Sequence, residues 1–312
     1  MKTFALGKSS LTTSRLAYGC WRLVEMNNGK ASAEAIAQGR AAVRAAFEAG
    51  YTLFDHADIY CDGAAEKVFG QVLKEIPTLR DRLVIATKCG VRKPGDPAPD
   101  SPGRYDLSAE YIVESCEQSL RRLGVETIDL YQLHRPDYLL NPEEMAGAFM
   151  QLKLAGKVRE FGVSNFRPTQ VVALQKACPL PLVVHQVQIS LARLDCFEDG
   201  TLDQCLAEKM TPLAWSPLGG GRFGEGATKW SAPESQQTAA VNAELDAIAK
   251  QHATTRSNVA LAWLLKHPAR IVPIVGSTNP ARIRDSVRAA DIALSRDEWY
   301  RLLLAARGER LP

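Results

Sequence analysis

The chain has 312 residues, of which 46% are hydrophobic and 23% charged, a composition typical of a soluble globular protein. Its 38 basic and 35 acidic side chains leave a formal net charge of only +3, and no basic run predicts a nucleic-acid partner. Seven scattered cysteines without a C-x-x-C pair argue against a disulfide framework or a structural zinc site and favour a reducing compartment. With neither a signal peptide nor a membrane-length apolar run, we expect a cytoplasmic protein without a membrane partner.

Apolar runs and turn residues predict a regular alternation of strands and helices along the chain. An N-terminal hairpin over residues 4–14 precedes eight predicted strands, at 16–18, 53–54, 83–87, 128–133, 158–163, 182–187, 213–215 and 271–275. Helices are predicted at 33–49, 65–76, 108–123, 142–156, 168–176, 202–209, 241–252 and 257–267, followed by one opened by Pro280 and one capped by Ser295. Long loops are predicted at 89–106 and 218–236.

Eight successive strand–helix units predict an α/β fold, a single (β/α)₈ TIM barrel spanning residues 1–312. The hairpin would cap the barrel, and extra helices would follow at the C-terminal end. An open doubly wound sheet is the structural alternative. Active sites of such barrels lie at the carboxyl ends of the strands, so residues at those positions are the candidates for function.

Four polar residues follow three neighbouring predicted strands. Asp55 and Tyr60 come after the second strand, Lys88 after the third and His134 after the fourth. Singly, each has an ordinary explanation: a turn former, a packing residue, a solvated cation or a satisfied imidazole. Barrel closure places the three strand ends side by side, and this favours one shared site.

Such a cluster suits proton transfer from a phenol. Tyrosine titrates near 10, so an adjacent Lys88 ammonium would lower its pKa toward neutrality, while Asp55 would keep the ammonium charged. His134 would orient a carbonyl oxygen, and Tyr60 would protonate it. Carbonyl reduction also needs hydride from a nicotinamide or a flavin.

Several runs together resemble the aldo-keto reductase family, over about residues 16–284. They are Asp55-x-Ala57-x-x-Tyr60, Lys88 and the segments 129–134, 156–159 and 162–166. Within that family, the run Asp-His-Ala-Asp-Ile-Tyr is closest to a subgroup of bacterial reductases. The resemblance implies NADPH-dependent reduction of aldehydes or ketones to alcohols, with NADPH or NADP⁺ lying across the barrel mouth and no Rossmann domain.

The resemblance also implies which residues bind the cofactor. Ser164, Asn165 and Gln186 match positions that hold the nicotinamide carboxamide, and Trp215 matches a ring that stacks on the nicotinamide; a barrel-core role is the alternative for Trp215. Other implied cofactor positions are Gly19, Cys20, Trp21, Asp55, Ser216, Leu218, Gly219, Gly276, Ser277, Thr278 and Arg282.

Two glycine-containing segments are candidates for phosphate binding. Residues 219–224 fit G-x-G-x-x-G but lack a following helical run, which favours a loop over the pyrophosphate, or a plain surface loop, rather than a Rossmann turn. Residues 276–282 open the eighth barrel helix, where Arg282 matches the family's 2′-phosphate arginine. Gly276 stands where a lysine is frequent, which weakens the implied preference for NADP over NAD.

The implied substrate walls are Trp21, His56, Tyr60, Tyr105 and His134. His56 has a second interpretation, as a hydrogen-bonding residue behind the site. The sequence thus predicts a small-molecule carbonyl substrate and a monomer or small homo-oligomer.

Two other functions remain open at this point. His56 and Asp58 with Lys88 and His134 loosely mimic the metal site of a barrel hydrolase, although a second metal set is missing; metal analysis would decide. A nicotinamide-binding, redox-sensing regulatory subunit would bind cofactor tightly without turning over aldehydes.

Overall fold

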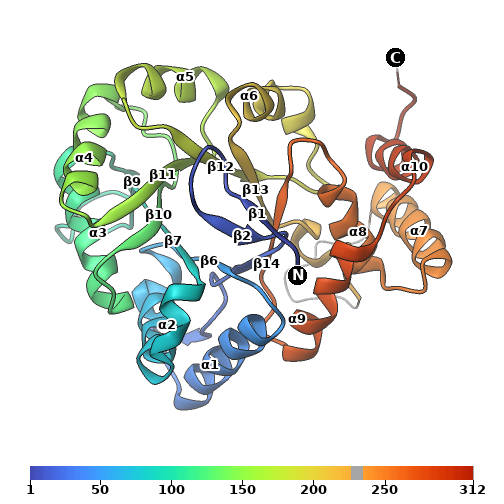
Figure 1. Ribbon diagram of the computed structural model, residues 1–312, viewed down its shortest axis with the longest axis horizontal. Coiled ribbons are helices and arrows are strands. Elements are labelled where there is room, and N and C mark those ends of the chain that lie inside the picture. The colour runs from blue at the N-terminus through green and yellow to red at the C-terminus, as the bar shows by residue number, and fades with distance from the viewer. Residues whose placement is uncertain (226–234, 312) are drawn as a thin grey trace.

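The computed structural model describes residues 1–225 and 235–311, and within them eight parallel strands close into a barrel (Figure 1). The barrel strands are β3 (Ala17–Gly19), β6 (Leu53–Asp55), β7 (Val84–Cys89), β10 (Ile128–Leu133), β11 (Val158–Ser164), β12 (Leu182–Gln188), β13 (Thr211–Trp215) and β14 (Val272–Val275). Each pairs with its neighbours in chain order, and β14 pairs with β3 to complete the ring. The predicted (β/α)₈ barrel is confirmed, and the open sheet is wrong.

Helices surround the strands, and their starts agree with the predicted caps. They are α1 (Ala33–Glu48), α2 (Ala64–Glu75), α3 (Ala109–Leu123), α4 (Pro142–Leu154), α5 (Pro168–Ala177), α6 (Thr201–Glu208), α7 (Gln236–Gln251), α8 (Arg256–Leu265), α9 (Pro280–Ser286) and α10 (Arg296–Arg307). The side chains of Ser32, Ser108 and Ser295 accept hydrogen bonds from backbone N–H groups in the first turns of α1, α3 and α10. These bonds satisfy donors that a helix start otherwise leaves unpaired.

The helix α7 begins earlier than predicted. Ser235 caps it, so α7 includes five residues before Val241, where the prediction began. Those residues are mostly polar and gave no apolar periodicity. Residues 226–234, which include Gly226 of the predicted loop 218–236, lie outside the described residues.

Helices α7 and α10 pack against each other beside the barrel and form the predicted C-terminal addition (Figure 1). The indoles of Trp263 and Trp299 stack with ring centroids 5.1 Å apart, and each indole N–H donates to the other residue's carbonyl oxygen. This reciprocal pair attaches α10 to α8, because both polar tips are satisfied within an apolar cluster.

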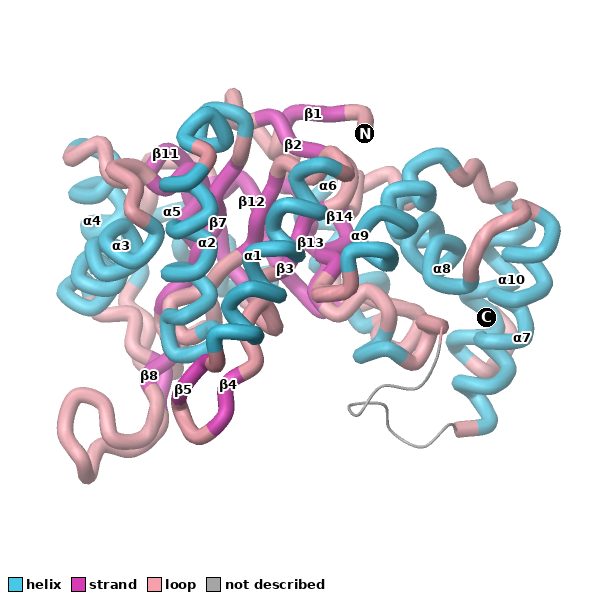
Figure 2. Tube along the Cα trace, turned by 90° about the horizontal axis from the view of Figure 1, so that it is seen from below, coloured by secondary structure: helices cyan, strands magenta, loops and turns pink. Residues whose placement is uncertain are grey.

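The N-terminal hairpin of β1 (Thr3–Ala5) and β2 (Thr12–Ser14) closes one end of the barrel, as predicted (Figure 2). Leu6 and Leu11 insert into the apolar barrel interior. Gly7 has φ +57°, and a Cβ there would lie 2.3 Å from the carbonyl oxygen of Val183, so the close approach requires glycine. The opposite end of the barrel is therefore the open one.

Short ribbons lie at the open end of the barrel, and 3₁₀ turns connect elements at both ends. The ribbon β8 (Val91–Arg92) with β9 (Arg104–Tyr105) lies within the predicted loop 89–106, and β4 (Met26–Asn27) pairs with β5 (Lys30–Ala31) after the first barrel strand. Two-residue strands carry too little pattern to be predicted. The 3₁₀ helices are η1 (Tyr60–Gly63), η2 (Pro77–Arg82), η3 (Asp195–Phe197), η4 (Gly219–Gly221) and η5 (Val287–Asp291).

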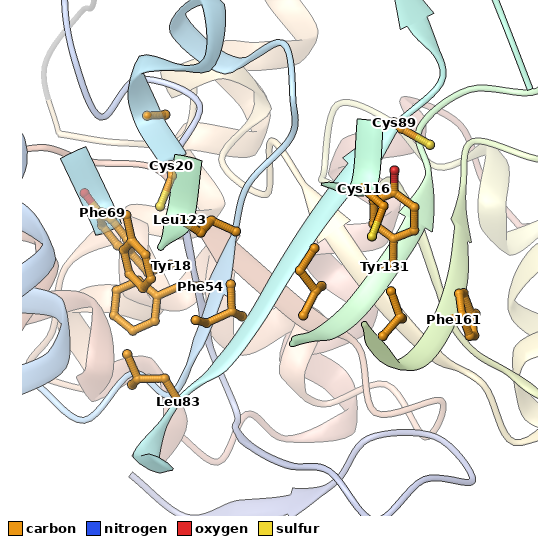
Figure 3. Packing of buried hydrophobic residues seen from close by; sticks show 14 of the residues in the cluster. Tyr18, Cys20, Phe54, Phe69, Leu83, Cys89, Cys116, Leu123, Tyr131 and Phe161 are labelled. Atoms are coloured by element: carbon orange, nitrogen blue, oxygen red, sulfur yellow. The ribbon is translucent and has the colours of Figure 1, made fainter. Parts of the chain in front are cut away.

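Two apolar layers hold the barrel together. Outward-facing strand residues such as Tyr18, Phe54 and Tyr131 pack against helix residues such as Phe69 of α2 (Figure 3). Inward-facing residues fill the interior. Because side chains two residues apart on a strand share a face, the residue two positions after each interior residue points to the same axis, nearer the open end.

This periodicity converts an apolar interior into a polar layer at the open end. In the inner cluster are Leu53, Ala86, Leu130, Val184 and Leu213. Two residues later on the same strands come Asp55, Lys88, Gln132, Gln186 and Trp215. None of the helices in the part of the chain described here has the length and apolar character that a membrane crossing requires.

Candidate active site

A buried ion pair occupies the centre of the polar layer. The Lys88 Nζ donates to Asp55 Oδ1 at 2.6 Å and to the backbone oxygen of His56 at 2.6 Å. Both charged side chains are almost completely buried. Gln186 Nε2 donates to the other carboxylate oxygen of Asp55 at 3.3 Å. The pair is thus fixed between β6, β7 and β12.

Tyr60 lies against this pair on the turn η1. The left-handed backbone of Cys61 and Asp62, with φ 52° and 54°, turns the chain sharply after Tyr60. Its ring centroid lies 5.0 Å from Lys88 Nζ and 5.9 Å from the imidazole of His134, with the two rings nearly perpendicular. The structure therefore brings together all four residues that follow the predicted strands.

The electrostatics of the cluster differ from the sequence-based expectation in one respect. Burial and the nearby Asp55 carboxylate raise the pKa of Tyr60 well above its usual value, whereas Lys88 was expected to lower it. Burial lowers the pKa of Lys88, and Asp55 opposes that effect. Burial and two nearby cations hold the pKa of His134 well below its usual value, so the imidazole is neutral. A protonated phenol beside a neutral imidazole can donate a proton to an oxygen atom.

Ser164, Asn165 and Trp215 form a second hydrogen-bonded group. Asn165 Nδ2 donates to Ser164 Oγ at 2.8 Å and to the His134 backbone oxygen at 3.1 Å. Its Oδ1 accepts from the Trp215 indole N–H at 3.0 Å. Asn165 has φ 61°, a conformation that Asn adopts more readily than most residues. The amide of Asn165 is therefore engaged within the protein and orients Trp215.

The predicted first-strand residues differ in exposure. A Cβ on Gly19 would lie 2.7 Å from Ile274 Cγ2, so the absence of a side chain there is required. Cys20 is completely buried, and burial raises the pKa of its thiol well above the usual value. Its buried position argues against the predicted contact with a cofactor. Trp21 is 57% exposed and remains available to a ligand.

The predicted loop after β13 begins with a compact turn. Ser216 has φ 51°, its carbonyl oxygen accepts from Gly219 N at 2.9 Å, and Leu218 O accepts from Phe223 N at 3.2 Å. A Cβ on Gly219 would lie 2.8 Å from the Phe223 ring. This part of the loop is thus ordered by its own contacts.

The predicted phosphate-binding segment lies at the surface. Gly276, Thr278 and Arg282 are exposed, and Ser277 is half-buried. Arg282 Nη2 donates to the backbone oxygen of Glu225 at 3.2 Å, which leaves its other donors toward solvent. Arg282 and the loop after β13 therefore lie close together.

The predicted substrate residues also differ in their exposure to solvent. His56 is completely buried, its ring lies 4.6 Å from the Phe69 ring, and burial lowers its pKa to about 3. This placement argues against substrate contact, and both ring nitrogens lack partners among the described residues. Tyr105 on β9 is 37% exposed at the open end of the barrel.

Two residues near the cluster were not selected from the sequence. Gln132 pairs in register with Lys88 and Gly162, and its amide is buried without a hydrogen-bond partner in the described part of the chain. Its polar side chain between Tyr131 and Leu133, two residues before His134, was the available signal. Arg135 places its guanidinium carbon 5.5 Å from the Trp215 ring centroid, and its charge lowers the pKa of His134.

Asp58 is a third residue whose position the sequence did not fully explain. Its Oδ2 accepts from Ser115 Oγ at 2.9 Å and from Tyr111 OH at 3.3 Å, whereas Oδ1 is buried with no partner among the described residues. Burial raises the pKa of Asp58 to about 7, although the Ser115 hydrogen bond opposes the shift. Asp58 connects the segment that carries Tyr60 to α3.

We expect Asp58 to make stability depend on pH. Between about pH 4 and pH 7 the unfolded chain releases this proton while the folded protein keeps it, so the free energy of unfolding falls as pH rises. The shift from 3.8 to about 7 corresponds to a decrease of up to about 4 kcal/mol. Urea unfolding should show that Asp58→Asn is similar to the natural protein at pH 4 and more stable at pH 8. A stability difference that does not change with pH would contradict this expectation.

In residues 1–225 and 235–311, no three His, Cys, Asp or Glu side chains are grouped closely enough to hold a metal ion. His56 has its ring against Phe69, and the carboxylate of Asp58 faces Ser115 on α3. His56 and Asp58, which the sequence suggested as ligands of a hydrolase-type metal site, therefore contact different parts of the protein.

Comparisons with known proteins agree on one family. The model of the Aldo/keto reductase family matches residues 15–303. The chain is 43% identical to 6-dehydroglucose reductase of Novosphingobium aromaticivorans, over 98% of this chain and 96% of the relative. It is 38% identical to oxidoreductase YdhF of Escherichia coli, over 96% and 95%. Its structure resembles that of the thermostable aldo-keto reductase Tm1743 solved with the inhibitor epalrestat, with TM-score 0.83, 26% identity and coverage of 98% and 100%.

Proposed function

The chain belongs to the aldo-keto reductase family, and from this membership we propose that it reduces aldehydes or ketones to alcohols with NADPH as the hydride donor and Tyr60 as the proton donor. Family membership supports an oxidoreductase that acts on carbonyl groups. We propose in addition that the cofactor is NADPH and that single residues have the roles given below.

The observation that carries the proposal is the contact of Tyr60 with Lys88 and His134 at the open end of the barrel. A raised pKa keeps the phenol protonated at neutral pH, which is the form that a general acid needs. When Tyr60 gives up its proton, the Lys88 ammonium 5.0 Å from its ring centroid stabilises the phenolate. Lys88 thus acts on the product of proton transfer rather than on the resting phenol.

The other two residues hold this arrangement in place. Asp55 compensates the buried ammonium, which would otherwise lose its charge through burial. His134 is neutral and lies edge-on to Tyr60, so a ring N–H can position the substrate's carbonyl oxygen within reach of the phenol. Together the four residues orient and protonate the oxygen, and the bound NADPH supplies the hydride.

The residues predicted to hold the nicotinamide fit it in part. Gln186 Oε1 is buried and unpartnered among the described residues, so it is an available acceptor for a carboxamide N–H. Ser164 Oγ accepts from Asn165 and can donate its own proton. Trp215 is partly exposed and is held by Asn165, so its ring can stack on the nicotinamide. Asn165 would act mainly by orienting that ring.

Preference for NADPH over NADH would come from Arg282. Its guanidinium is exposed and bonds only to a backbone oxygen within the described residues, so a phosphate group can replace that partner. Gly276 stands where the family often has a lysine, and a Cβ there would have no atom within 4 Å. This position therefore supplies no second positive charge to the phosphate. A single arginine predicts a moderate preference.

The names of two relatives suggest where to look for a substrate. Proteins of Novosphingobium aromaticivorans and Agrobacterium fabrum, 43% and 38% identical to this chain, are both 6-dehydroglucose reductases. Sugar-derived aldehydes are therefore the first carbonyl compounds to test, followed by simple aldehydes and ketones. We place the reaction in the cytoplasm, in a monomer or small homo-oligomer that needs neither nucleic acid nor a membrane.

Titration of NADPH and then NADH, followed by tryptophan fluorescence, tests the cofactor. We expect strong quenching by NADPH, a weaker response to NADH, and consumption of NADPH when an aldehyde is added. Arg282→Gln should weaken NADPH binding about 10- to 100-fold and leave NADH binding unchanged, because it removes a charge-assisted contact to the 2′-phosphate.

The neighbouring exposed Arg284 on α9 provides the matched control, because it pairs with Glu48. Arg284→Gln should leave both affinities unchanged. Equal affinities for NADPH and NADH would contradict the proposed binding of the 2′-phosphate by Arg282 but would remain consistent with a reductase. No binding of either cofactor would refute the proposed function.

A further inference from the structure

A cavity of about 720 Å³ lies at the hairpin end of the barrel, opposite the end that carries Tyr60. The N-terminal segment with β1, the end of α8 and the residues around η5 form its walls. Figure 2 shows the N-terminus and the hairpin on the side of the barrel opposite β4, β5 and β8. The volume falls in the range of pockets that hold small metabolites.

Positive charge is concentrated around this cavity. Lys2, Arg15, Lys266 and Arg270 line it, against the single carboxylate of Asp291. In the described part of the chain, none of the four basic side chains forms an ion pair with a carboxylate. The whole chain has a net charge of only +3, so this excess of three charges is a local feature.

Arg15 is the most constrained of the four. Its Nη2 donates to the Leu265 backbone oxygen at 2.8 Å, and its guanidinium carbon lies 5.5 Å from the Phe4 ring centroid. Its Nε is buried, with no hydrogen-bond partner in the described residues. Burial, and then the charge of Arg270, lower the pKa of Arg15. A fixed, partly desolvated guanidinium with an unused N–H and a like charge nearby is unfavourable unless an anion is present.

The backbone also holds Arg270 in an uncommon conformation. Arg270 has φ 58°, in a region that asparagine and glycine tolerate better than arginine does. Its N–H donates to the His267 backbone oxygen at 3.0 Å, which closes a tight turn between α8 and β14. Arg270 is exposed where it lines the cavity and forms no ion pair within the described residues, so its guanidinium is available to a ligand.

We propose that this cavity is a second binding site, which takes a small metabolite bearing an oxyanion group, phosphate or carboxylate. Arg15 and Arg270 converge on the oxyanion, and Lys2 and Lys266 add to the positive potential. The site is separate from the carbonyl-reducing site and does not depend on the proposed function. Occupancy would also restrain η5, which follows directly after the helix α9 that carries Arg282.

Thermal unfolding in pyrophosphate and in citrate, each compared with potassium chloride of equal ionic strength, tests the site. We expect either anion to raise Tm, by about 5 °C when its concentration is ~100-fold above its Kd. Pyrophosphate and citrate distinguish a phosphate from a carboxylate preference. Arg282→Gln, which removes the proposed cofactor phosphate contact, should retain the rise.

Arg270→Asn provides the discriminating result. Without an added anion it should raise Tm, because it removes a like charge and relieves an uncommon backbone conformation. Addition of the anion should then cause no further rise in the Tm of Arg270→Asn. Lys209→Asn is the matched control, because Lys209 is an exposed residue with φ 53° at the end of α6, far along the chain from the cavity. Lys209→Asn should show a similar rise in Tm without an anion, and its Tm should still rise further when the anion is added.

Arg15→Gln is a second variant with the same expected loss of response. The proposal is overturned if neither anion raises the Tm of the natural protein above the chloride value. It is equally overturned if the anion-dependent rise persists in Arg270→Asn and in Arg15→Gln.

Discussion

Tyr60→Phe is expected to lower kcat for aldehyde reduction by about 10³-fold, with little change in NADPH affinity. The substitution removes one oxygen atom and keeps the ring that packs edge-on against His134. A positioned general acid contributes roughly 10²- to 10⁴-fold to such a reaction, so the loss should appear in kcat. Stopped-flow or steady-state assays of NADPH consumption, combined with fluorescence titration of NADPH, would separate chemistry from binding.

A matched substitution checks that the effect belongs to this phenol. Tyr138 follows the same strand as His134 and is 96% exposed, so Tyr138→Phe should leave kcat unchanged. If Tyr60→Phe reduced aldehydes at the natural rate, another group would have to supply the proton, and the assignment of Tyr60 would be wrong.

Lys88→Met is expected to impair both activity and stability, for different reasons. Activity should fall by about 10²-fold or more, because no cation remains beside the developing phenolate. Stability should fall by about 3–5 kcal/mol, because the buried Asp55 carboxylate loses its ammonium partner and, among the described residues, keeps only the 3.3 Å contact from Gln186. Urea unfolding and turnover measurements on the same samples would report the two effects.

The double variant Asp55→Asn with Lys88→Met separates these effects. Removing both charges leaves no unpaired ion, so most of the lost stability should return while activity stays low. Recovery of activity together with stability would show that Lys88 has only a structural role, contrary to the proposal.

Another charged group provides a comparison for Lys88. Asp129 is completely buried and pairs with Arg80 and Arg159 away from Tyr60. Arg159→Met should therefore lower stability without lowering kcat. A similar loss of kcat in this variant would mean that general destabilisation, rather than the local charge, explains the Lys88 result.

The strands and helices of the barrel were predictable because their signals are local. Serine caps such as Ser32 and Ser295 and apolar runs such as residues 271–275 act over a few neighbouring residues. The ribbon of β8 and β9 was missed, because two-residue strands depend on a partner outside the local sequence. The early start of α7 was missed, because its first residues are polar and carry no apolar period.

The four candidate residues were predictable because each lies at or just after the carboxyl end of a strand, and closure of the ring brings neighbouring strand ends together. What each side chain contacts was decided by packing. The sequence does not show that Asn165 holds Trp215, that His56 lies against Phe69, or that Gln132 is buried without a partner. These facts depend on which face of each strand is inward and on what lies across the barrel.

The direction of the Tyr60 pKa shift is the plainest example of a property that packing decides. From residue types alone, a lysine beside a tyrosine predicts a lowered pKa. In the folded protein, desolvation and then the Asp55 carboxylate raise it. The cavity with Arg15 and Arg270 is similar, because these residues are 255 positions apart and meet only when β3 closes onto β14. Local patterns and chain order were sufficient to predict the barrel, the family and the four residues at the strand ends. Burial, charge balance and hydrogen-bond partners could not be predicted in this way, because they depend on groups that the fold brings together from distant parts of the chain.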